Sequence, residues 1–495
     1  MAEFQSTYRQ ILKSTSIFGG VQVFQIVIAL INSKFVAVLL GPAGMGIASL
    51  INSGISLIQV LTNLGLGTSA VKNLSAANAT GDNNRINEVS NIIKKLVWVS
   101  GLLGMIVTIV FARTLSRISF GNYDYTYAFI FVSVVLLFSQ LAIGRNVILQ
   151  SLRKLILLAK ASLIGSVIGL LVSIPIYYIW GIKGIVPAII ISSFFSLVNS
   201  YYFSKKVKIP KLKIQTKVLL REGISMGKLG IVISLAQLMT LGSSYIIRIY
   251  ISNQGGVGEV GLFAAGFALI NTYVGMVLNA MSTDYFPRLS GVANNNKAST
   301  LMVNQQAEIT TLILTPILTF FIVFINFVIL ILLSSKFITI TGMVQWAALG
   351  MFFRALSWPM GYLMLTKGTP KIYFLNELIS TSYILFLNML GYHYWGLNGL
   401  GFSFIIGNLL TLIQVYVLVN FKFDFKLQPN VLGMFALQLF IGIVCIVAIK
   451  LLLQPYIYII AIPLIILSII YSYSNLNRVL NLKSILISVF NRIKH

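Results

Sequence analysis

Apolar runs of about 20 residues recur from one end of this chain to the other, and they limit the possible folds more than any other feature. A helix of that length spans the hydrocarbon core of a bilayer, which is roughly 30 Å thick. Hydrophobic residues make up 57% of the 495 residues and charged residues only 9%. This balance excludes a soluble globular chain. The sequence therefore predicts an all-α polytopic membrane protein.

Fourteen runs predict fourteen transmembrane helices. They cover residues 15–40, 44–70, 92–112, 125–150, 157–180, 184–204, 229–252, 259–284, 306–333, 341–366, 372–394, 398–420, 431–453 and 456–473. The first run lacks a small-residue cleavage pattern, so we interpret it as a retained helix and not as a signal peptide. The single cysteine, Cys445, lies in the thirteenth run. It excludes an intrachain disulfide, and no metal site is predicted.

The net charge of +26 is distributed unevenly between the predicted loops. The termini and even-numbered loops hold 27 Lys and Arg residues, whereas the odd-numbered loops hold five. Basic residues concentrate on the cytoplasmic side of membrane proteins, so both termini are predicted to be cytoplasmic. The same charges favour contact with anionic membrane lipid. Topology explains the excess charge, and we expect no nucleic-acid partner.

The second half of the chain repeats the first at one constant offset in the numbering. The segment Trp180-Gly-Ile-Lys-Gly184 matches Trp395-Gly-Leu-Asn-Gly399, and by the same offset Gly41 and Gly46 match Gly256 and Gly261. Each repeat holds six runs, so both lobes insert in the same orientation, around an axis along the membrane normal. The predicted division is an N-terminal lobe (1–204), a basic cytoplasmic linker (205–221), a second lobe (222–420), helices thirteen and fourteen (421–474) and an amphipathic cytoplasmic tail (475–495).

Four cations fall at positions of the predicted helices that should be buried in lipid: Lys34, Arg145, Arg248 and Arg354. A charge at the centre of a membrane helix costs about 2.5–3.5 kcal/mol on insertion scales, so such residues usually face a partner, a cavity or a ligand. Because few carboxylates accompany them, the four predict a cavity for an anionic substrate.

Each of these cations also has a structural alternative. Arg354 could pair with Glu377 or satisfy the backbone that Pro359 frees. Lys34, Arg145 and Arg248 lie nearer helix ends, where their side chains could extend to the membrane surface.

The turn Leu40-Gly-Pro-Ala-Gly-Met-Gly46 resembles the same turn in Wzx-type polysaccharide flippases. These proteins belong to the multidrug/oligosaccharidyl-lipid/polysaccharide (MOP) exporter superfamily, with two MATE-like six-helix lobes. Within this group, the chain resembles the O-antigen and enterobacterial-common-antigen translocases. The resemblance implies a bacterial inner-membrane flippase that uses no cofactor and is not an enzyme. It implies that an undecaprenyl-diphosphate-linked oligosaccharide crosses from the cytoplasmic to the periplasmic leaflet. A polysaccharide polymerase is a further partner that it suggests.

The charges fit such a substrate, because Arg can contact a phosphate through two hydrogen bonds and Lys through a point charge. Four carboxylates are candidates for ion coupling: Asp124, Asp284, Glu308 and Glu377. Each could take up a proton in a dry cavity. Each could instead neutralise a neighbouring cation or favour a helix N-terminus.

Three other functions remain open. A cation-coupled multidrug exporter would share the fold, but the surplus of cavity cations disfavours cationic drugs. A membrane glycosyltransferase or polymerase would need larger loops with catalytic groups than this chain has. A structural scaffold would not explain charges at membrane depth.

Overall fold

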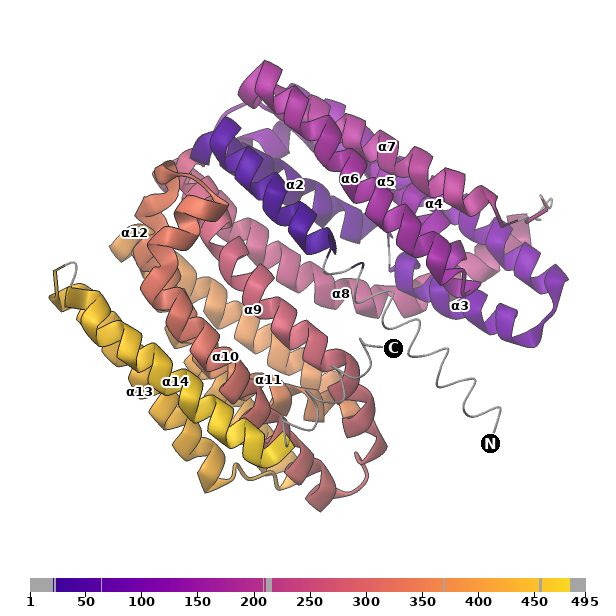
Figure 1. Ribbon diagram of the computed structural model, residues 1–495. Coiled ribbons are helices and arrows are strands. Elements are labelled where there is room, and N and C mark those ends of the chain that lie inside the picture. The colour runs from indigo at the N-terminus through magenta and orange to yellow at the C-terminus, as the bar shows by residue number, and fades with distance from the viewer. Residues whose placement is uncertain are drawn as a thin grey trace, which may run out of the picture. The chain divides into compact units, whose positions relative to one another are not determined.

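The computed structural model describes residues 21, 24–63, 65–207, 209–210, 216–367, 370–453 and 456–480. The described residues form helices and short connections (Figure 1). A first helix, Phe24–Leu39, precedes the labelled elements. These are α2 (Gly41–Asn63), α3 (Leu66–Thr80), α4 (Asn83–Phe120), α5 (Thr126–Ser151), α6 (Leu155–Trp180), η1 (Gly181–Gly184), α7 (Ile185–Lys205), α8 (Thr216–Gly255), α9 (Val257–Gly291), α10 (Asn296–Leu332), η2 (Ser335–Ile340), α11 (Thr341–Thr366), α12 (Pro370–Phe423), α13 (Pro429–Leu451) and α14 (Tyr456–Leu480).

The predicted all-α membrane class is confirmed. Among the described residues, nine helical stretches are long and apolar enough to cross a bilayer. Two of them, Leu155–Lys205 and Lys371–Phe423, have 51 and 53 residues, and each contains two of the predicted runs. The tail at 481–495 and linker residues 208 and 211–215 lie outside the described part of the chain.

The second predicted run, 44–70, is too long. Its helix, α2, ends at Asn63, and Gly65 adopts a left-handed conformation with φ of 65° before α3 begins. Glycine reaches this region without steric cost, so it separates two helices that apolar content alone would join. A similar glycine, Gly41 with φ of 65°, starts α2 directly after the first helix. It makes the tight turn expected from the Leu40–Gly46 motif.

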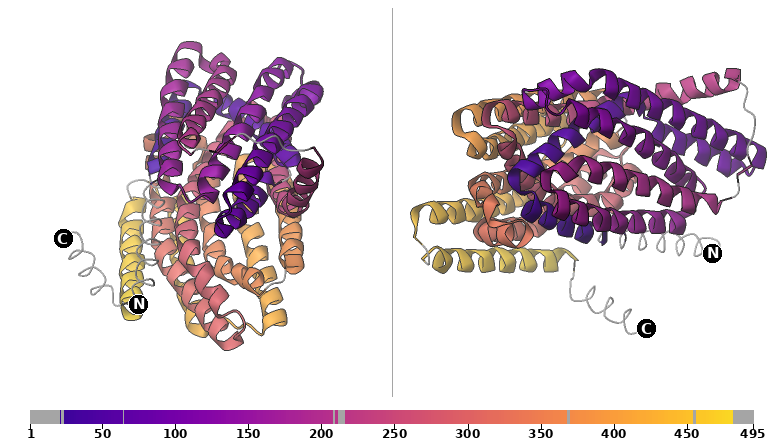
Figure 2. Two further views of the ribbon diagram at one scale, coloured as in Figure 1. Left: turned by 90° about the vertical axis from the view of Figure 1, so that its right-hand side faces the viewer. Right: turned by 90° about the horizontal axis from the view of Figure 1, so that it is seen from above.

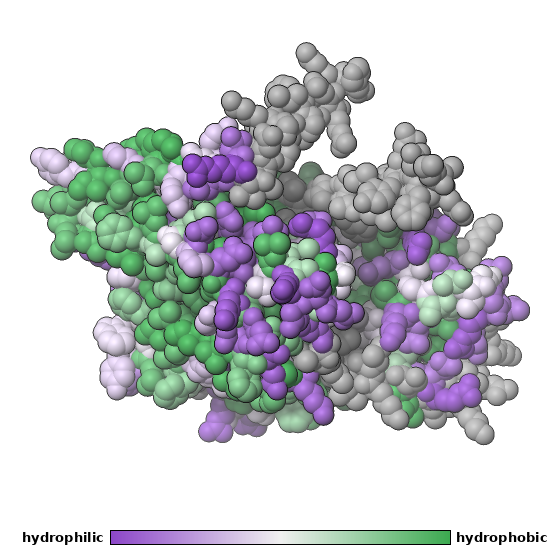
Figure 3. All heavy atoms as spheres, turned by 90° about the horizontal axis from the view of Figure 1, so that it is seen from below, coloured by the Kyte–Doolittle hydropathy of each residue, from purple (hydrophilic) through white to green (hydrophobic). Residues whose placement is uncertain are grey.

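Large apolar side chains cover much of the protein surface. On α4 they include Val99, Leu103, Ile106 and Val110, which recur every three or four residues and are 47–69% exposed. Figure 3 shows apolar side chains over wide areas of one face, with polar side chains gathered apart from them. A helix face that is apolar outward fits contact with lipid.

The helix ends reproduce the sequence repeat. The offset that relates Trp180 to Trp395 also relates both ends of α5 to those of α11, and the start of α6 to that of α12. The backbone follows it as well. Gly181 has φ of 53° and ψ of −133°, and Gly396 has φ of 54° and ψ of −138°. Both glycines interrupt a helix after a tryptophan, so the two Trp-Gly motifs form the same turn.

The chain forms two compact units, Met1–Gly261 with Leu332–Ser334, and Leu262–Ile331 with Ser335–His495. In unit 1, α5 packs against α3, α4 and α7, and α8 packs against α2, α3 and α4. The division therefore groups α8 with the N-terminal helices, beyond the predicted lobe of residues 1–204.

Unit 1 depends on a very close approach of two glycines that the repeat makes equivalent. A Cβ atom added to Gly46 would lie 1.8 Å from the carbonyl oxygen of Val257. One added to Gly261 would lie 1.8 Å from the carbonyl oxygen of Pro42. The start of α2 and the start of α9 therefore touch backbone to backbone, as small residues allow in membrane proteins.

In unit 2, the side chain of Tyr285 is fully buried, and its hydroxyl donates to the carbonyl oxygen of Pro359 at 2.9 Å. Helices α13 and α14 lie side by side (Figures 1 and 2). Buried Gln438 joins them, because its Oε1 accepts from Ser468 at 2.6 Å and its Nε2 donates to Ser472 at 3.0 Å. Hydrogen bonds of this kind hold apolar helices in one register.

We predict that Gly46→Ala destabilises the protein by about 1–3 kcal/mol or more, the range typical of overpacking. The added methyl group would collide with backbone, which cannot rotate away as a side chain can. Gly258→Ala is the matched control, because a Cβ atom there has nothing within 4 Å. Thermal unfolding in detergent measures both. Equal midpoints for the two variants would contradict the close-packing account.

Candidate functional site

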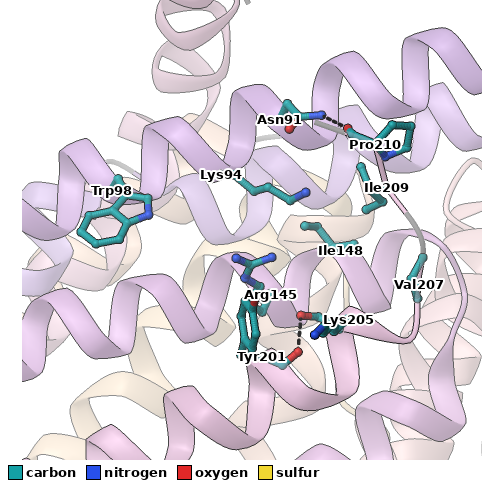
Figure 4. Close-up of a pocket in the computed structure, with 11 residues that line it drawn as sticks. Asn91, Lys94, Trp98, Arg145, Ile148, Tyr201, Lys205, Val207, Ile209 and Pro210 are labelled. Carbon is teal, nitrogen blue, oxygen red and sulfur yellow. Dashed lines mark hydrogen bonds between the residues drawn. The ribbon is translucent and has the colours of Figure 1, made fainter. Parts of the chain in front are cut away.

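A cavity of about 750 Å³ opens in unit 1 between α4, α5, α7 and the segment that follows α7. Its walls carry three cations, Lys94, Arg145 and Lys205. The rest of the lining consists of Asn91, Trp98, Ile148, Tyr201, Ser204, Val207, Ile209 and Pro210. In Figure 4, Lys94 and Arg145 reach into the space between their helices, and Tyr201 and Lys205 lie on α7 beside it.

Arg145 is held by an aromatic ring. Its guanidinium carbon lies 4.8 Å from the centre of the Tyr201 ring, within the range of a cation–π contact. On the far wall, the Asn91 amide donates to the carbonyl oxygen of Pro210 at 2.9 Å, which fastens the segment after α7 to α4. This hydrogen bond holds Pro210 in the wall of the cavity.

Arg248 lies elsewhere in unit 1, where α8 packs against α2. Its Nε donates to the Ser49 hydroxyl at 2.8 Å, and Nη1 donates to the Ser244 carbonyl oxygen at 2.6 Å. One turn earlier on α8, the buried Tyr245 hydroxyl is hydrogen-bonded to Ser119 of α4. Arg248 thus belongs to a polar contact that joins helices.

Lys34 is half-buried in the first described helix. Two residues before it, Asn32 accepts a hydrogen bond from Ser173 of α6 at 3.3 Å. Because residues two apart in a helix do not share a face, this contact turns the Asn32 side of the helix toward α6 and leaves the direction of Lys34 unassigned.

Arg354 lies in α11 of unit 2 and is exposed, although the residues that follow it, Ala355 and Leu356, are buried. The nearby charge that acts on it is the half-buried Glu377 of α12. Within the described chain, its guanidinium forms no hydrogen bond or ion pair with a side chain or with the backbone near Pro359. The structure therefore presents Arg354 as an open cation with a carboxylate in its neighbourhood.

The other carboxylates occupy unlike surroundings. Asp124 is exposed in the turn between α4 and α5. Asp284 is exposed, and it forms an ion pair with Arg288, one turn away, at 2.6 Å. Asp284 therefore neutralises a neighbouring cation, which was the alternative to a role in ion coupling. Glu308 is half-buried in α10 and acts electrostatically on Tyr471 of α14. No group of three or more metal-ligating side chains occurs in the described part of the chain.

Of the four predicted cations, Arg145 lines this cavity, and Lys94 and Lys205 line it as well. Lys94 and Lys205 were not predicted as site residues, because basic residues near helix ends are expected from membrane topology alone. A helical signal was present. Asn91, Lys94 and Trp98 lie three and four residues apart on one face of α4, as do Tyr201 and Lys205 on α7.

The chain is similar in sequence to proteins of polysaccharide biosynthesis. A family model described as polysaccharide biosynthesis protein matches residues 35–342. The lipid III flippases of Escherichia coli (strain K12) and Shigella flexneri are each 23% identical over 362 residues, which cover 70% of this chain and 83% of theirs.

Two solved structures resemble the fold. The lipid II flippase MurJ, in an inward closed conformation, has a TM-score of 0.72 at 14% identity, covering 94% of this chain and 99% of its own. An inward-facing multidrug resistance MATE family transporter of the MOP superfamily has a TM-score of 0.67 at 17% identity, covering 81% and 94%. The predicted MOP fold is therefore confirmed.

We predict that Ser49→Ala lowers the free energy of unfolding by about 1–3 kcal/mol, because it leaves the Arg248 Nε without its hydroxyl partner in a half-buried site. Ser53→Ala, one turn further along α2 and also half-buried, is the control and should have little effect. Thermal unfolding in detergent compares them. A control variant as unstable as Ser49→Ala would rule out this role for the hydrogen bond.

Proposed function

We propose that this chain, which belongs to the polysaccharide biosynthesis protein family, is a flippase for an undecaprenyl-diphosphate-linked oligosaccharide. It would move this lipid from the cytoplasmic to the periplasmic leaflet of a bacterial inner membrane. The family match over residues 35–342 is the observation that carries the proposal. Similarity to the lipid III flippases over most of their length supports it.

The charges at membrane depth favour an anionic substrate. An exposed arginine in an apolar helix is costly unless it meets water, a carboxylate or a ligand. Arg354 has the open N–H edge that a diphosphate group could occupy through paired hydrogen bonds. A cationic drug would be repelled by the same group, which disfavours a multidrug exporter.

The finer assignments extend this proposal. The transported glycan would be a repeat unit of O-antigen or a related polysaccharide, delivered to a polymerase in the periplasm. Transport would proceed by alternating access without direct use of ATP, with the predicted lobes 1–204 and 222–420 as its moving parts. Lys34, Arg145, Arg248 and Arg354 are the proposed cationic contacts for the diphosphate.

The test is leaflet exchange of a fluorescent undecaprenyl-diphosphate oligosaccharide in liposomes. Arg354→Ala should slow exchange at least about tenfold, since a hydrogen bond to a charged group contributes about 1.5–3 kcal/mol. Arg354→Lys should be intermediate, because an ammonium group keeps the charge and loses the paired geometry. Arg117→Ala removes an exposed cation at the end of α4 and should leave exchange unchanged.

No exchange by the native protein with several glycans, together with gradient-driven efflux of organic cations, would overturn the proposal in favour of the drug exporter. Full exchange by Arg354→Ala would retain the flippase and remove Arg354 from the substrate site.

Among the four carboxylates, Glu377 is the one whose charge acts on Arg354. If Glu377 gains and loses a proton during the cycle, Glu377→Gln should flatten the pH dependence of exchange. Asp284→Asn is the control, because exposed ion pairs such as Asp284–Arg288 contribute little. Identical pH profiles for native protein and Glu377→Gln would exclude Glu377 from coupling.

A further inference from the structure

The cavity between α4, α5 and α7 has the chemistry of an anion site. Lys94, Arg145 and Lys205 reach it from three helices, and no carboxylate is among its lining residues. Like charges gathered around one space repel each other, and a bound anion relieves that repulsion. All three residues lie near predicted cytoplasmic ends of their helices, where lipid phosphates are found.

The cluster of Lys94, Arg145 and Lys205 has no counterpart at the equivalent positions of the second repeat. The offset that relates the two Trp-Gly motifs gives the equivalent positions in the second repeat. Lys94, Arg145 and Lys205 correspond there to Ile309, Met360 and Asn420. Met360 is fully buried in an apolar cluster of unit 2 that includes Leu363 and Val419. The position of the cavity residue Arg145 is thus taken by a buried apolar side chain in the second repeat.

The surroundings of the cavity suit an amphipathic ligand. Trp98 and Tyr201 are 50% and 48% exposed on its rim, and such aromatic residues settle at the boundary between headgroups and acyl chains. Beyond the rim, α4 presents Val99 and Leu102, and α7 presents Phe194 and Val198, all exposed. A headgroup in the cavity could therefore leave its hydrocarbon chains along these apolar faces.

We propose that this cavity binds the headgroup of a membrane lipid that carries two phosphate groups. Basic pockets between transmembrane helices on the cytoplasmic side bind headgroups of this kind. Arg145 supplies a planar N–H edge suited to one phosphate, and the two lysines supply point charges for the other. The volume of about 750 Å³ accommodates two phosphates with their linking atoms.

Two lipids share this chemistry. One is diphosphatidylglycerol, a membrane phospholipid, and the other is undecaprenyl diphosphate, the lipid part of the proposed substrate. Only the second source rests on the proposed function, and the binding experiment below requires no transport.

The experiment is native mass spectrometry of the full-length protein in detergent with each of three lipids: diphosphatidylglycerol, undecaprenyl diphosphate and phosphatidylglycerol. Native protein should retain at least one two-phosphate lipid more than tenfold better than phosphatidylglycerol, which has one phosphate. The variant Lys94→Gln/Arg145→Gln/Lys205→Gln should lose that preference, and Arg145→Lys should keep part of it.

The control Arg113→Gln/Arg117→Gln/Lys183→Gln removes three exposed cations from the other end of α4 and from η1. It should bind as the native protein does. The midpoints of thermal unfolding show whether both triple variants fold. If the cavity variant does not fold, the single variant Lys205→Gln replaces it in the binding experiment, because the Lys205 side chain is exposed. The lipid whose retention falls in the cavity variant identifies the source.

Equal loss in both triple variants would overturn the site in favour of general charge attraction. Unchanged binding in the cavity variant, or equal retention of phosphatidylglycerol, would also overturn it. Loss of lipid binding with normal leaflet exchange would support the site and remove Arg145 from the proposed contacts for the transported diphosphate.

Discussion

A polar group without a partner is unstable in hydrocarbon, and this constraint determines how the helices meet. Gln140 of α5 is almost fully buried and donates to Asn63 of α2 at 2.6 Å and to Ser100 of α4 at 2.9 Å. Gln438 joins α13 to α14 in the same manner. Because lipid offers these amides nothing to bind, each one fixes the register of two or three otherwise apolar helices. Close glycine contacts, such as Gly46 with Gly261, then bring helix backbones together.

The fold could be predicted from sequence because the bilayer imposes one length and one secondary structure on each run. The repeat could be predicted as well, since glycines that need positive φ, such as Gly181 and Gly396, leave a visible motif. The residue at which α2 ends could not be predicted from the sequence. The predicted run continues to residue 70, whereas the backbone at Gly65 is left-handed directly before α3 begins. Hydropathy contains no information about that dihedral angle.

The sequence could predict single residues of the candidate site, but it could not predict which other residues lie beside them. Depth in an apolar run singled out Arg145 and Arg248, because a charge there stands out against its neighbours. The residues that contact Arg248 or share the cavity with Arg145 have no such distinguishing feature in the sequence. Ser49, which binds Arg248, is an ordinary serine 199 positions away. Lys94 and Lys205 lie at helix ends, where basic residues are expected for topology alone. Only the packing of α4, α5 and α7 reveals that the two lysines share a cavity with Arg145.

The repeat also places its two arginines at different depths. Helices α5 and α11 are equivalent and of equal length, yet Arg145 lies within two turns of the end of α5, whereas Arg354 lies at the middle of α11. At about 1.5 Å per residue, the two cations differ by about 9 Å in position along their helices. That distance is comparable to the separation between a lipid headgroup and the upper part of its acyl chains. Arg145, nearer its helix end and surrounded by lysines and exposed aromatic rings, suits a lipid resting in its own leaflet. Arg354, deeper in its helix and close to Glu377, suits a charge that must be met in transit. On the two proposals, one repeat of the duplicated fold holds a cation for lipid binding near the membrane surface, and the other holds a cation at depth for the transported diphosphate.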